Sequence, residues 1–239
     1  MGGTVVHIEC KANLGFAKGN NIGALYAKKV HANYVLFSNN DIKFLEKISL
    51  KKVANSFIKM DKTFIVGPRI VSEDGICSGP YYKPHIFSYL FLQQIDLAFQ
   101  RIFNKNKNKS GFYYSVHGCF FFVDLHRFCD VGMFDEHTFL YREEEILSAR
   151  GLLKGYNVYY TDAFKVIHEG SGTIKNNVDV IKIKKQMFSS AVYYFSTYRN
   201  ASWVTIGLAK LCFEYIYIPF YLVTKDGWEL VKKYRKLIV

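Results

Sequence analysis

The feature that most constrains the fold is a series of short apolar segments that alternate with helical patterns along residues 1–174. Each segment is shorter than a buried helix would be, and most are closed by Gly, Pro, Asn or Asp, which is typical of strands. Strands that alternate with helices favour an α/β fold. The expected strands are residues 4–8, 33–37, 63–66, 116–123, 157–160 and 164–167.

The expected helices lie between these strands, at residues 17–30, 45–59, 87–103 and 143–153, with Gly155 as the residue that ends the last of them. The first strand, helix and second strand fit a βαβ unit, which requires a parallel sheet. We therefore predict an α/β domain over residues 1–174, with a mostly parallel sheet flanked by helices. Residues 104–110 (NKNKNKS) are expected to form a surface loop.

The charge is strongly basic, with a net value of +12, which favours an anionic partner: nucleic acid, an acidic membrane surface or a phosphorylated substrate. Residues 175–239 hold 11 Lys and Arg against 4 Asp and Glu, so this segment is predicted to be a separate helical, basic extension. Its aromatic residues, interleaved with Lys182, Lys184, Lys232 and Lys233, fit amphipathic helices on an anionic cytoplasmic leaflet. A nucleic-acid partner is not expected, because no RNP, KH or helix-turn-helix signature is present.

One segment, residues 203–223, approaches the length of a membrane span, but Lys210, Glu214 and Pro219 interrupt it. Two alternatives to a span stay open: helices that lie on the membrane and helices that pack on the first domain. No signal peptide is visible at the N-terminus. Five scattered cysteines without a CxxC pair indicate reduced, mostly buried thiols.

Asp41 directly follows an apolar strand, where ligand crevices of open α/β sheets lie. Its carboxylate would suit Mg²⁺ or Mn²⁺ bridging a diphosphate, since hard cations prefer oxygen ligands. An Asx turn or a helix N-cap is the alternative role.

Glu143, Glu144 and Glu145 begin a helix, where negative charge is stabilised by the helix dipole, so a solvated first turn is the default expectation. Successive helical residues point about 100° apart, which directs at least one of the three inward. An inward carboxylate acquires a raised pKa through desolvation, and a raised pKa suits a general base.

His168 ends another apolar strand and is followed by Gly170, Ser171 and Gly172. Its imidazole would suit a metal or a phosphate, and the Gly/Ser run offers backbone N–H groups to an anion. A surface histidine at a strand end is an equally good interpretation.

The order of these segments resembles family 2 glycosyltransferases of the bacterial rhamnosyltransferase-like kind. Residues 13–23 (NLGFAKGNNIG) are similar to the family's NxGFxxGxNxG segment, and residues 35–42 (VLFSNNDI) to the strand that ends in its DxD-like motif. Residues 132–150 (GMFDEHTFLYREEEILSAR) resemble its GxFDExFFxYxEDxDLxxR block, and residues 155–158 its GYxV. Residues 117–120 resemble the strand that enters its sugar and acceptor site, and residues 167–173 its histidine block.

The resemblance implies a GT-A (Rossmann-like) fold and an inverting transfer of a sugar from a nucleotide-sugar donor to a saccharide, with a lipid-linked or oligosaccharide acceptor, in cell-surface polysaccharide synthesis. It implies a divalent metal (Mg²⁺ or Mn²⁺) and a location at the cytoplasmic face of a bacterial plasma membrane. The residue roles that it implies are Glu144 as base with Glu143 beside it, Asp41 and His168 as metal ligands, Asn13, Gly15, Phe16, Asn21, Asn39 and Asp41 for the nucleotide sugar, and His117, Gly118, Asp135 and Glu136 for the acceptor and sugar pocket.

The family begins with a further strand and helix before its NxGF segment, and here only a dozen residues precede Asn13. We therefore expect a chain shortened at its N-terminus. The alternative function is a catalytically inactive homologue that binds only a membrane or a partner.

Overall fold

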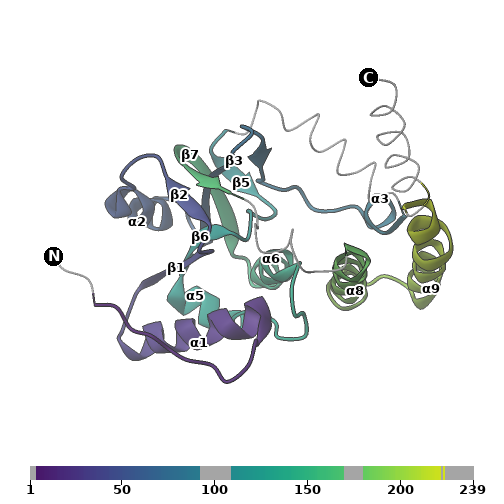
Figure 1. Ribbon diagram of the computed structural model, residues 1–239. Coiled ribbons are helices and arrows are strands. Elements are labelled where there is room, and N and C mark those ends of the chain that lie inside the picture. The colour runs from purple at the N-terminus through teal and green to yellow at the C-terminus, as the bar shows by residue number, and fades with distance from the viewer. Residues whose placement is uncertain (1–3, 92–108, 170–179, 222, 224–239) are drawn as a thin grey trace.

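The computed structural model describes residues 4–91, 109–169, 180–221 and 223 of the 239-residue chain. It contains one mixed sheet covered by helices (Figure 1). The strands are β1 (Tyr34–Ser38), β2 (Ile42–Phe44), β3 (Thr63–Ser72), β4 (Cys77–Ser78), β5 (Gly111–Tyr113), β6 (Phe120–Asp124) and β7 (Asn157–His168). The helices are α1 (Gly15–Lys29), α2 (Leu50–Lys59), α3 (Ile86–Phe91), α5 (Leu125–Asp130), α6 (Glu143–Leu153), α8 (Val180–Tyr198), α9 (Trp203–Cys212) and the π-helical η1 (Phe213–Tyr217).

The α/β class is confirmed, but the prediction of a mostly parallel sheet is wrong. The strand order is β1-β6-β3-β7-β2, with β4 on β3 and β5 on β7, and among the described strands only β3 and β7 pair in parallel. The predicted strand at residues 4–8 is the cause of the error, because this segment has no secondary structure and Val5 is 96% exposed. The predicted βαβ unit over residues 4–37 therefore does not form, and β1 pairs instead with β6 in antiparallel register.

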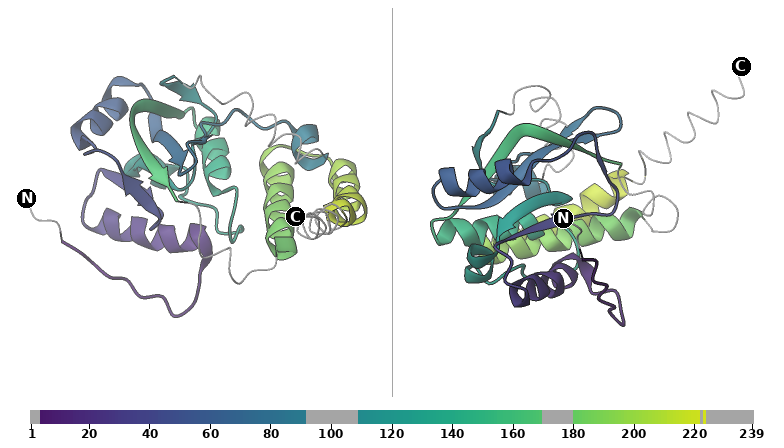
Figure 2. Two further views of the ribbon diagram at one scale, coloured as in Figure 1. Left: turned by 45° about the horizontal axis from the view of Figure 1, so that its top comes forward. Right: turned by 90° about the vertical axis from the view of Figure 1, so that its left-hand side faces the viewer.

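The core lies on both faces of the sheet, because side chains alternate between the faces along each strand. Phe121 and Val123 of β6 join a cluster under α1 and α5, whereas Phe120 and Phe122 join a cluster under α2. Figure 2 shows α1 and α2 on opposite sides of the sheet. The three consecutive phenylalanines of β6 therefore contribute side chains to two separate hydrophobic clusters, one on each face of the sheet.

Strand β7 replaces the two strands predicted at residues 157–160 and 164–167. Its register with β3 shifts between the pairs Gly67–Tyr160 and Arg69–Lys165. Between these two pairs β7 contains more residues than β3, and the additional residues form a β-bulge. The polar centre of the bulge, with Asp162 exposed, made the segment look like two strands in the sequence.

Helix α6 has the predicted bounds, and Gly155 follows it with φ +76° as a left-handed C′ residue. Beyond it, α8 and α9 lie side by side at one end of the molecule (Figure 2). They pack through a separate cluster that includes Ile146 of α6, Phe188 and Tyr194 of α8, and Ala209 of α9. The described part of the C-terminal extension thus packs on the first domain.

Several predicted segments lie outside the described residues, and the prediction for the cysteines is wrong. The loop at 104–108, most of the helix predicted at 87–103, the Gly/Ser run at 170–172 and the basic residues beyond 223 are outside the described part. Among the cysteines only Cys119 is buried, whereas Cys10 is exposed and the others are half-buried, so the prediction of mostly buried thiols is wrong.

Two helical glycines provide a test of the packing of α6 against the sheet. A Cβ on Gly151 would lie 2.2 Å from Cζ of the fully buried Phe64, whereas a Cβ on Gly19 of α1 would meet nothing within 4 Å. We predict that Gly151→Ala lowers the free energy of unfolding by about 1 to 3 kcal/mol through overpacking. Gly19→Ala should raise it by up to about 1 kcal/mol, because alanine is the better helix former. Urea denaturation measures the free energy of unfolding of both variants. An equal change in the two variants would contradict the close contact between Gly151 and Phe64.

Candidate active site

A cleft of about 450 Å³ lies at the edge of the sheet where β1 and β7 end and β6 begins, facing the first turn of α6. The carboxyl ends of β1, β3 and β7 share this edge, since β6 runs antiparallel to β1 and β3. The cleft is lined by Phe16, Asn39, Asp41, Tyr81, Tyr82, Pro84, His117, Gly118, Cys119, Leu140, Tyr141, Arg142, Glu143, Glu144, Glu145, His168 and Met187.

Asp41 and His168 meet in this cleft, as the sequence predicts. Ile42 of β2 pairs with His168 of β7, and this register sets the preceding Asp41 beside the imidazole, with Oδ2 3.2 Å from Nε2. Oδ1 of Asp41 is buried and has no hydrogen-bond partner among the described residues. Because a buried carboxylate oxygen without a partner is costly, this atom fits a bound cation. Asp41 lies in the turn between β1 and β2, so it does not act as a helix N-cap.

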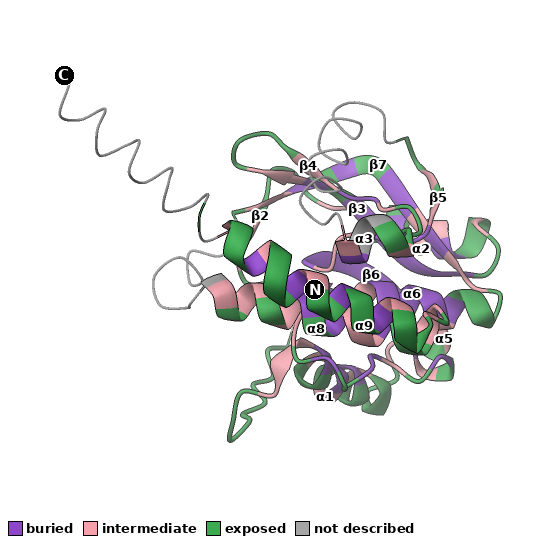
Figure 3. Ribbon diagram, turned by 90° about the vertical axis from the view of Figure 1, so that its right-hand side faces the viewer, coloured by how far each residue is buried: buried purple, intermediate pink, exposed green. Residues whose placement is uncertain are grey.

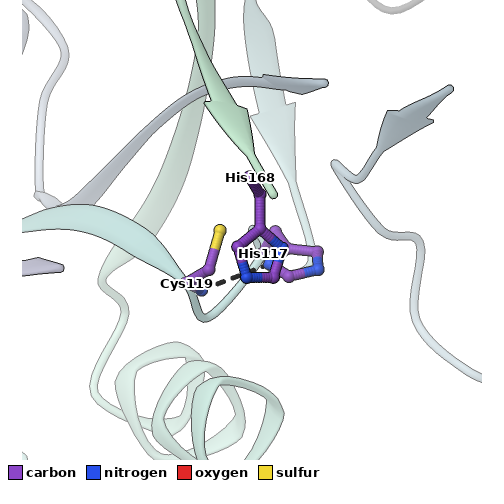
Figure 4. A group of neighbouring side chains, drawn as sticks. All are labelled: His117, Cys119 and His168. Atoms are coloured by element: carbon purple, nitrogen blue, oxygen red, sulfur yellow. Dashed lines mark hydrogen bonds between the residues drawn. The ribbon is translucent and has the colours of Figure 1, made fainter. Parts of the chain in front are cut away.

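His117 and Cys119 lie directly beside this pair (Figure 4). Nδ1 of His117 accepts a hydrogen bond of 3.2 Å from the backbone N–H of Cys119, and the ring lies 5.5 Å from that of His168. Burial, together with the neighbouring His168, lowers the pKa of His117 to about 4 despite the nearby Asp41. The lowered pKa favours the neutral imidazole, whose Nδ1 lone pair accepts the hydrogen bond from Cys119.

The glutamate-rich first turn of α6 is buried, so the default expectation of a solvated turn is wrong. Glu143 and Glu145 are 3% and 6% exposed. Glu145 accepts two hydrogen bonds from Nη1 of Arg142, at 2.7 and 2.6 Å, and Glu143 accepts one of 3.4 Å from Thr138. The charge of Arg142 and the positive end of the helix offset part of the cost of burying these carboxylates.

The turn is reached through two consecutive residues in the left-handed region, Tyr141 with φ +76° and Arg142 with φ +77°. This conformation is unfavourable for residues with a side chain and is concentrated at functional sites. It turns the chain so that α6 begins at the cleft, with the guanidinium of Arg142 directed back toward Glu145.

Glu144 lies over the backbone of Gly118. A Cβ at position 118 would lie 3.1 Å from Oε2 of Glu144, so only glycine leaves the carboxylate unobstructed. Burial, followed by the charges of Glu145 and Glu143, raises the pKa of Glu144. Burial likewise raises the pKa of Glu143 to about 7. A carboxylate with a pKa near neutrality can accept a proton from a substrate hydroxyl and release it to solvent.

Part of the residue set predicted for the nucleotide sugar lines the cleft. Phe16 and Asn39 do so, and the backbone N–H of Asn39 donates to the carbonyl of Cys119 at 2.8 Å. Asn13 and Gly15 shape the loop that presents Phe16: Oδ1 of Asn13 accepts from the N–H of Gly15 at 3.0 Å. Gly15 has φ +78°, and a Cβ there would lie 2.4 Å from the carbonyl oxygen of Phe139.

Asn21, Asp135 and Glu136 lie outside the cleft lining and hold elements together. The side chain of Asn21 donates to Oε1 of Glu136 and to the carbonyl of Phe134, both at 3.0 Å, which fixes α1 to the loop before α6. Asp135 accepts from the hydroxyl of Tyr193 at 2.7 Å and from that of Tyr198, which fixes α8 to the same loop. Burial alone would raise the pKa of Asp135, but these hydrogen bonds and those of His137 lower it to about 2.

Several residues of the cleft lining carry no role in the sequence prediction, and three of them bear on its chemistry. Cys119 is one of them, although its spacing from His117 in the HGC segment was a usable signal. Arg142 is the second, recognisable by its i,i+3 spacing to Glu145. Tyr81 is the third. An isolated β-bridge with Ser115 positions it at the cleft, and a contact between two such distant segments cannot be predicted from a local sequence pattern.

No known protein-family profile matches the chain, and no curated protein sequence matches it either. Among solved structures, the chain is similar to GalNAc-T7 with UDP, GalNAc and Mn²⁺, at 18% identity and a TM-score of 0.47, over 78% of this chain and 38% of that one. It is also similar to A197 from STIV, at 13% identity and a TM-score of 0.44, over 65% and 68% of the two chains. A third likeness is to the mannosyltransferase PcManGT from Pyrobaculum calidifontis with GDP-Man and Mn²⁺, at 12% identity and a TM-score of 0.37, over 93% and 62%. This chain thus spans less than two thirds of the length of GalNAc-T7 and of the mannosyltransferase.

The buried glutamates predict a stability that falls as pH rises through neutrality. The pKa values of Glu143 and Glu144 are raised in the folded state, so between pH 6.5 and 8.5 the folded protein binds more protons than the unfolded chain. The free energy of unfolding should therefore decrease by about 1 to 3 kcal/mol over this range. Urea denaturation across the range measures this decrease.

Glu143→Gln should remove part of this decrease and the double variant Glu143→Gln/Glu144→Gln most of it, because an amide does not ionise. A decrease that is equally large in the double variant would show that other groups cause it.

Proposed function

We propose that this protein is an inverting glycosyltransferase that uses a nucleotide-sugar donor, similar to the rhamnosyltransferase-like members of family 2. The observation that supports the proposal is that one cleft contains both a cation-accepting pair, Asp41 and His168, and a buried carboxylate with a raised pKa, Glu144. These residues come from separate sequence blocks, and each block resembles a part of that family.

The donor would bind with its diphosphate toward Asp41 and His168. Phe16 and Asn39 line the same part of the site, with Phe16 offering a face on which a base or sugar ring can pack. The orphaned Oδ1 of Asp41 and the imidazole of His168 would hold Mg²⁺ or Mn²⁺. When bound, the ion would stabilise the negative charge of the departing diphosphate as a Lewis acid.

Glu144 would act as the general base. Its carboxylate accepts the proton of the acceptor hydroxyl while the hydroxyl oxygen forms a bond to the anomeric carbon, and the bond from that carbon to the diphosphate oxygen breaks. Because the oxygen attacks from the face opposite the leaving group, the anomeric configuration is inverted. Gly118 leaves the space in which the acceptor can approach Glu144, and Glu143 lies beside the base to position it.

We further propose that the acceptor is lipid-linked and that the protein lies on the cytoplasmic face of a bacterial plasma membrane. The described residues include one helix, Trp203–Tyr221, that is long and apolar enough to cross a membrane, with 22% of its residues buried. Many positions of α9 are exposed and are green in Figure 3. Lys210 and Glu214 are among the exposed residues of the helix, but most of the others are apolar. The exposed large apolar side chains of the helix are Trp203, Val204, Leu208, Leu211, Tyr215, Ile216 and Phe220, and Val223 beyond it is exposed as well.

The lysines near this helix favour an orientation along the membrane surface. Lys185 pairs with Glu214 at 3.1 Å, and Lys184 lies over the rings of Tyr217 and Tyr221. Interfacial aromatic residues combined with lysines are typical of helices that lie at an anionic lipid surface.

The alternative function, a homologue that binds a partner without turnover, has one observation in its favour. β1 is an edge strand of the described sheet, and its residues Tyr34 and Leu36 are exposed. An open edge of this kind can accept a further strand. Donor turnover distinguishes the two functions.

For the enzymatic function we predict that Glu144→Gln lowers transfer by about 100- to 10,000-fold, because the general base is lost. The assay measures release of nucleoside diphosphate from a panel of nucleotide sugars with Mn²⁺ and isolated lipid-linked acceptors. Glu144→Asp should retain part of the activity, since it preserves the carboxylate and shortens its reach by one methylene.

Glu73→Gln is the matched control, because Glu73 is exposed and lies outside the cleft lining. Calorimetry should show that Glu144→Gln still binds the donor. Full transfer by Glu144→Gln would contradict the assigned base, and absence of turnover in the wild-type chain with every donor would favour the alternative function.

For the membrane location we predict that the wild-type protein sediments with phosphatidylglycerol vesicles and less with phosphatidylcholine vesicles. Leu208→Ser combined with Leu211→Ser should weaken binding about tenfold, because two exposed apolar side chains of α9 are lost. Leu153→Ser is the control, since Leu153 is 82% exposed at the end of α6. Equal loss in the control would contradict binding through α9.

A further inference from the structure

We propose that the floor of the cleft binds a thiophilic divalent cation, represented by Zn²⁺, through His117, Cys119 and His168. The proposal deepens the proposed function by defining a second class of ion for the same cleft. It rests on that function only in sharing Asp41 and His168, and ion binding can be measured without any donor or acceptor.

The three side chains lie close together in the cleft. One potential ligand atom from each of His117, Cys119 and His168 lies within 4.8 Å of the others (Figure 4). In a tetrahedral zinc site the ligand atoms lie about 3.4 to 3.7 Å apart, as follows from bonds of 2.0 to 2.3 Å. Side-chain rotations that shorten the longest of these separations by about 1 Å would close the three atoms around one ion.

The elements that carry these residues are fixed by the sheet. Cys119 immediately precedes β6, and its carbonyl accepts from the backbone N–H of Asn39 at 2.8 Å. His168 is held in register with both Ile42 of β2 and Ser72 of β3. His117 lies two residues before Cys119, so the HGC segment directs its imidazole and its thiol toward the same place.

The chemistry of the donor atoms selects the kind of ion. A thiolate and two neutral imidazoles are the ligands of Zn²⁺ and other soft or borderline ions. Mg²⁺ prefers oxygen ligands in an octahedral arrangement, which a sulfur and two nitrogens do not provide. The cluster is therefore poorly suited to Mg²⁺ and well suited to Zn²⁺.

A fourth ligand is available. Oδ1 of Asp41 is buried without a hydrogen-bond partner among the described residues, and Oδ2 of the same carboxylate lies 3.2 Å from Nε2 of His168. A carboxylate oxygen is an ordinary zinc ligand, and with it the set becomes four-coordinate. The unpartnered oxygen is an observation independent of the cluster itself.

Binding has two local costs. Nδ1 of His117 accepts a hydrogen bond from the N–H of Cys119, and an ion on that nitrogen would replace it. The thiol of Cys119 must also release its proton to solvent, as every cysteine ligand does. Burial, together with the nearby Asp41 and Glu144, raises the pKa of the Cys119 thiol, so we expect this proton to leave only when the ion binds.

The shared ligands have a consequence for the reaction. Asp41 and His168 would serve both this ion and the Mg²⁺ or Mn²⁺ of the proposed transfer, so the two classes of ion would exclude each other. Zn²⁺ at the cluster would then act as an inhibitor that competes with the catalytic ion.

The test is titration of the donor-free full chain with Co²⁺, a spectroscopic substitute for Zn²⁺, under anaerobic reducing conditions. We expect a thiolate-to-cobalt charge-transfer band together with the intense visible bands of tetrahedral cobalt, and loss of both when Zn²⁺ is added. Cys119→Ser should abolish the thiolate band and weaken Zn²⁺ binding about a hundredfold or more, since removal even of an outer-shell partner costs up to that factor.

Cys129→Ser is the matched control, because Cys129 is a half-buried thiol outside the cluster, and its band should remain. X-ray absorption of the Zn²⁺-loaded wild-type protein provides a readout that needs no variant, with one sulfur expected at about 2.3 Å. A cobalt spectrum without a thiolate band, a band that persists in Cys119→Ser, or a zinc shell without sulfur would overturn the proposal. None of these readouts involves transfer, so an inactive enzyme would not affect them.

Discussion

The burial of β3 on both faces is the constraint on which the rest of the structure depends. Its first six residues are all buried, and it pairs with β6 on one side and β7 on the other. A strand of this kind needs apolar cover above and below the sheet. Helix α2 supplies one layer, and α1 and α5 supply the other. The close packing of α6 on Phe64 follows from the same need, and it brings the glutamate-rich turn to the end of the sheet.

The cleft concentrates carboxylates that would repel one another in an apolar setting. Arg142 neutralises Glu145 with two hydrogen bonds, which leaves Glu143 and Glu144 with raised pKa values. The raised pKa makes the ionised form of Glu144 a stronger proton acceptor than an exposed glutamate, which suits the role of a base beside the cation site. The strained backbone at Tyr141 and Arg142 holds this arrangement in place.

The sequence predicts the elements whose signals are local. Helix α6 with its terminal Gly155 follows from periodicity and turn chemistry. The pairing of Asp41 with His168 was expected only from the family resemblance, and the two side chains do lie 3.2 Å apart. The direction of β6 could not be predicted, because an apolar run such as Phe120–Phe122 has the same pattern in parallel and antiparallel pairs. The burial of both Glu143 and Glu145 could not be predicted, because it depends on how the loop before α6 folds, with Thr138 donating to Glu143 and Arg142 to Glu145. Asp135 and Glu136 were placed in the pocket by resemblance, whereas their partners Tyr193 and Asn21 come from distant helices.

The bulge in β7 has a consequence for how relatives of this chain can differ in length. Because the ladder resumes at Lys165 after the bulge, residues 161–164, which lie opposite the single residue Pro68 of β3, do not affect the register that positions His168. An insertion or deletion within the bulge can be absorbed there, whereas a change of one residue between Lys165 and His168 would turn the histidine to the opposite face of the sheet. Evolutionary variation in strand length is therefore expected to accumulate at the bulge, while the four residues beyond it keep a constant count.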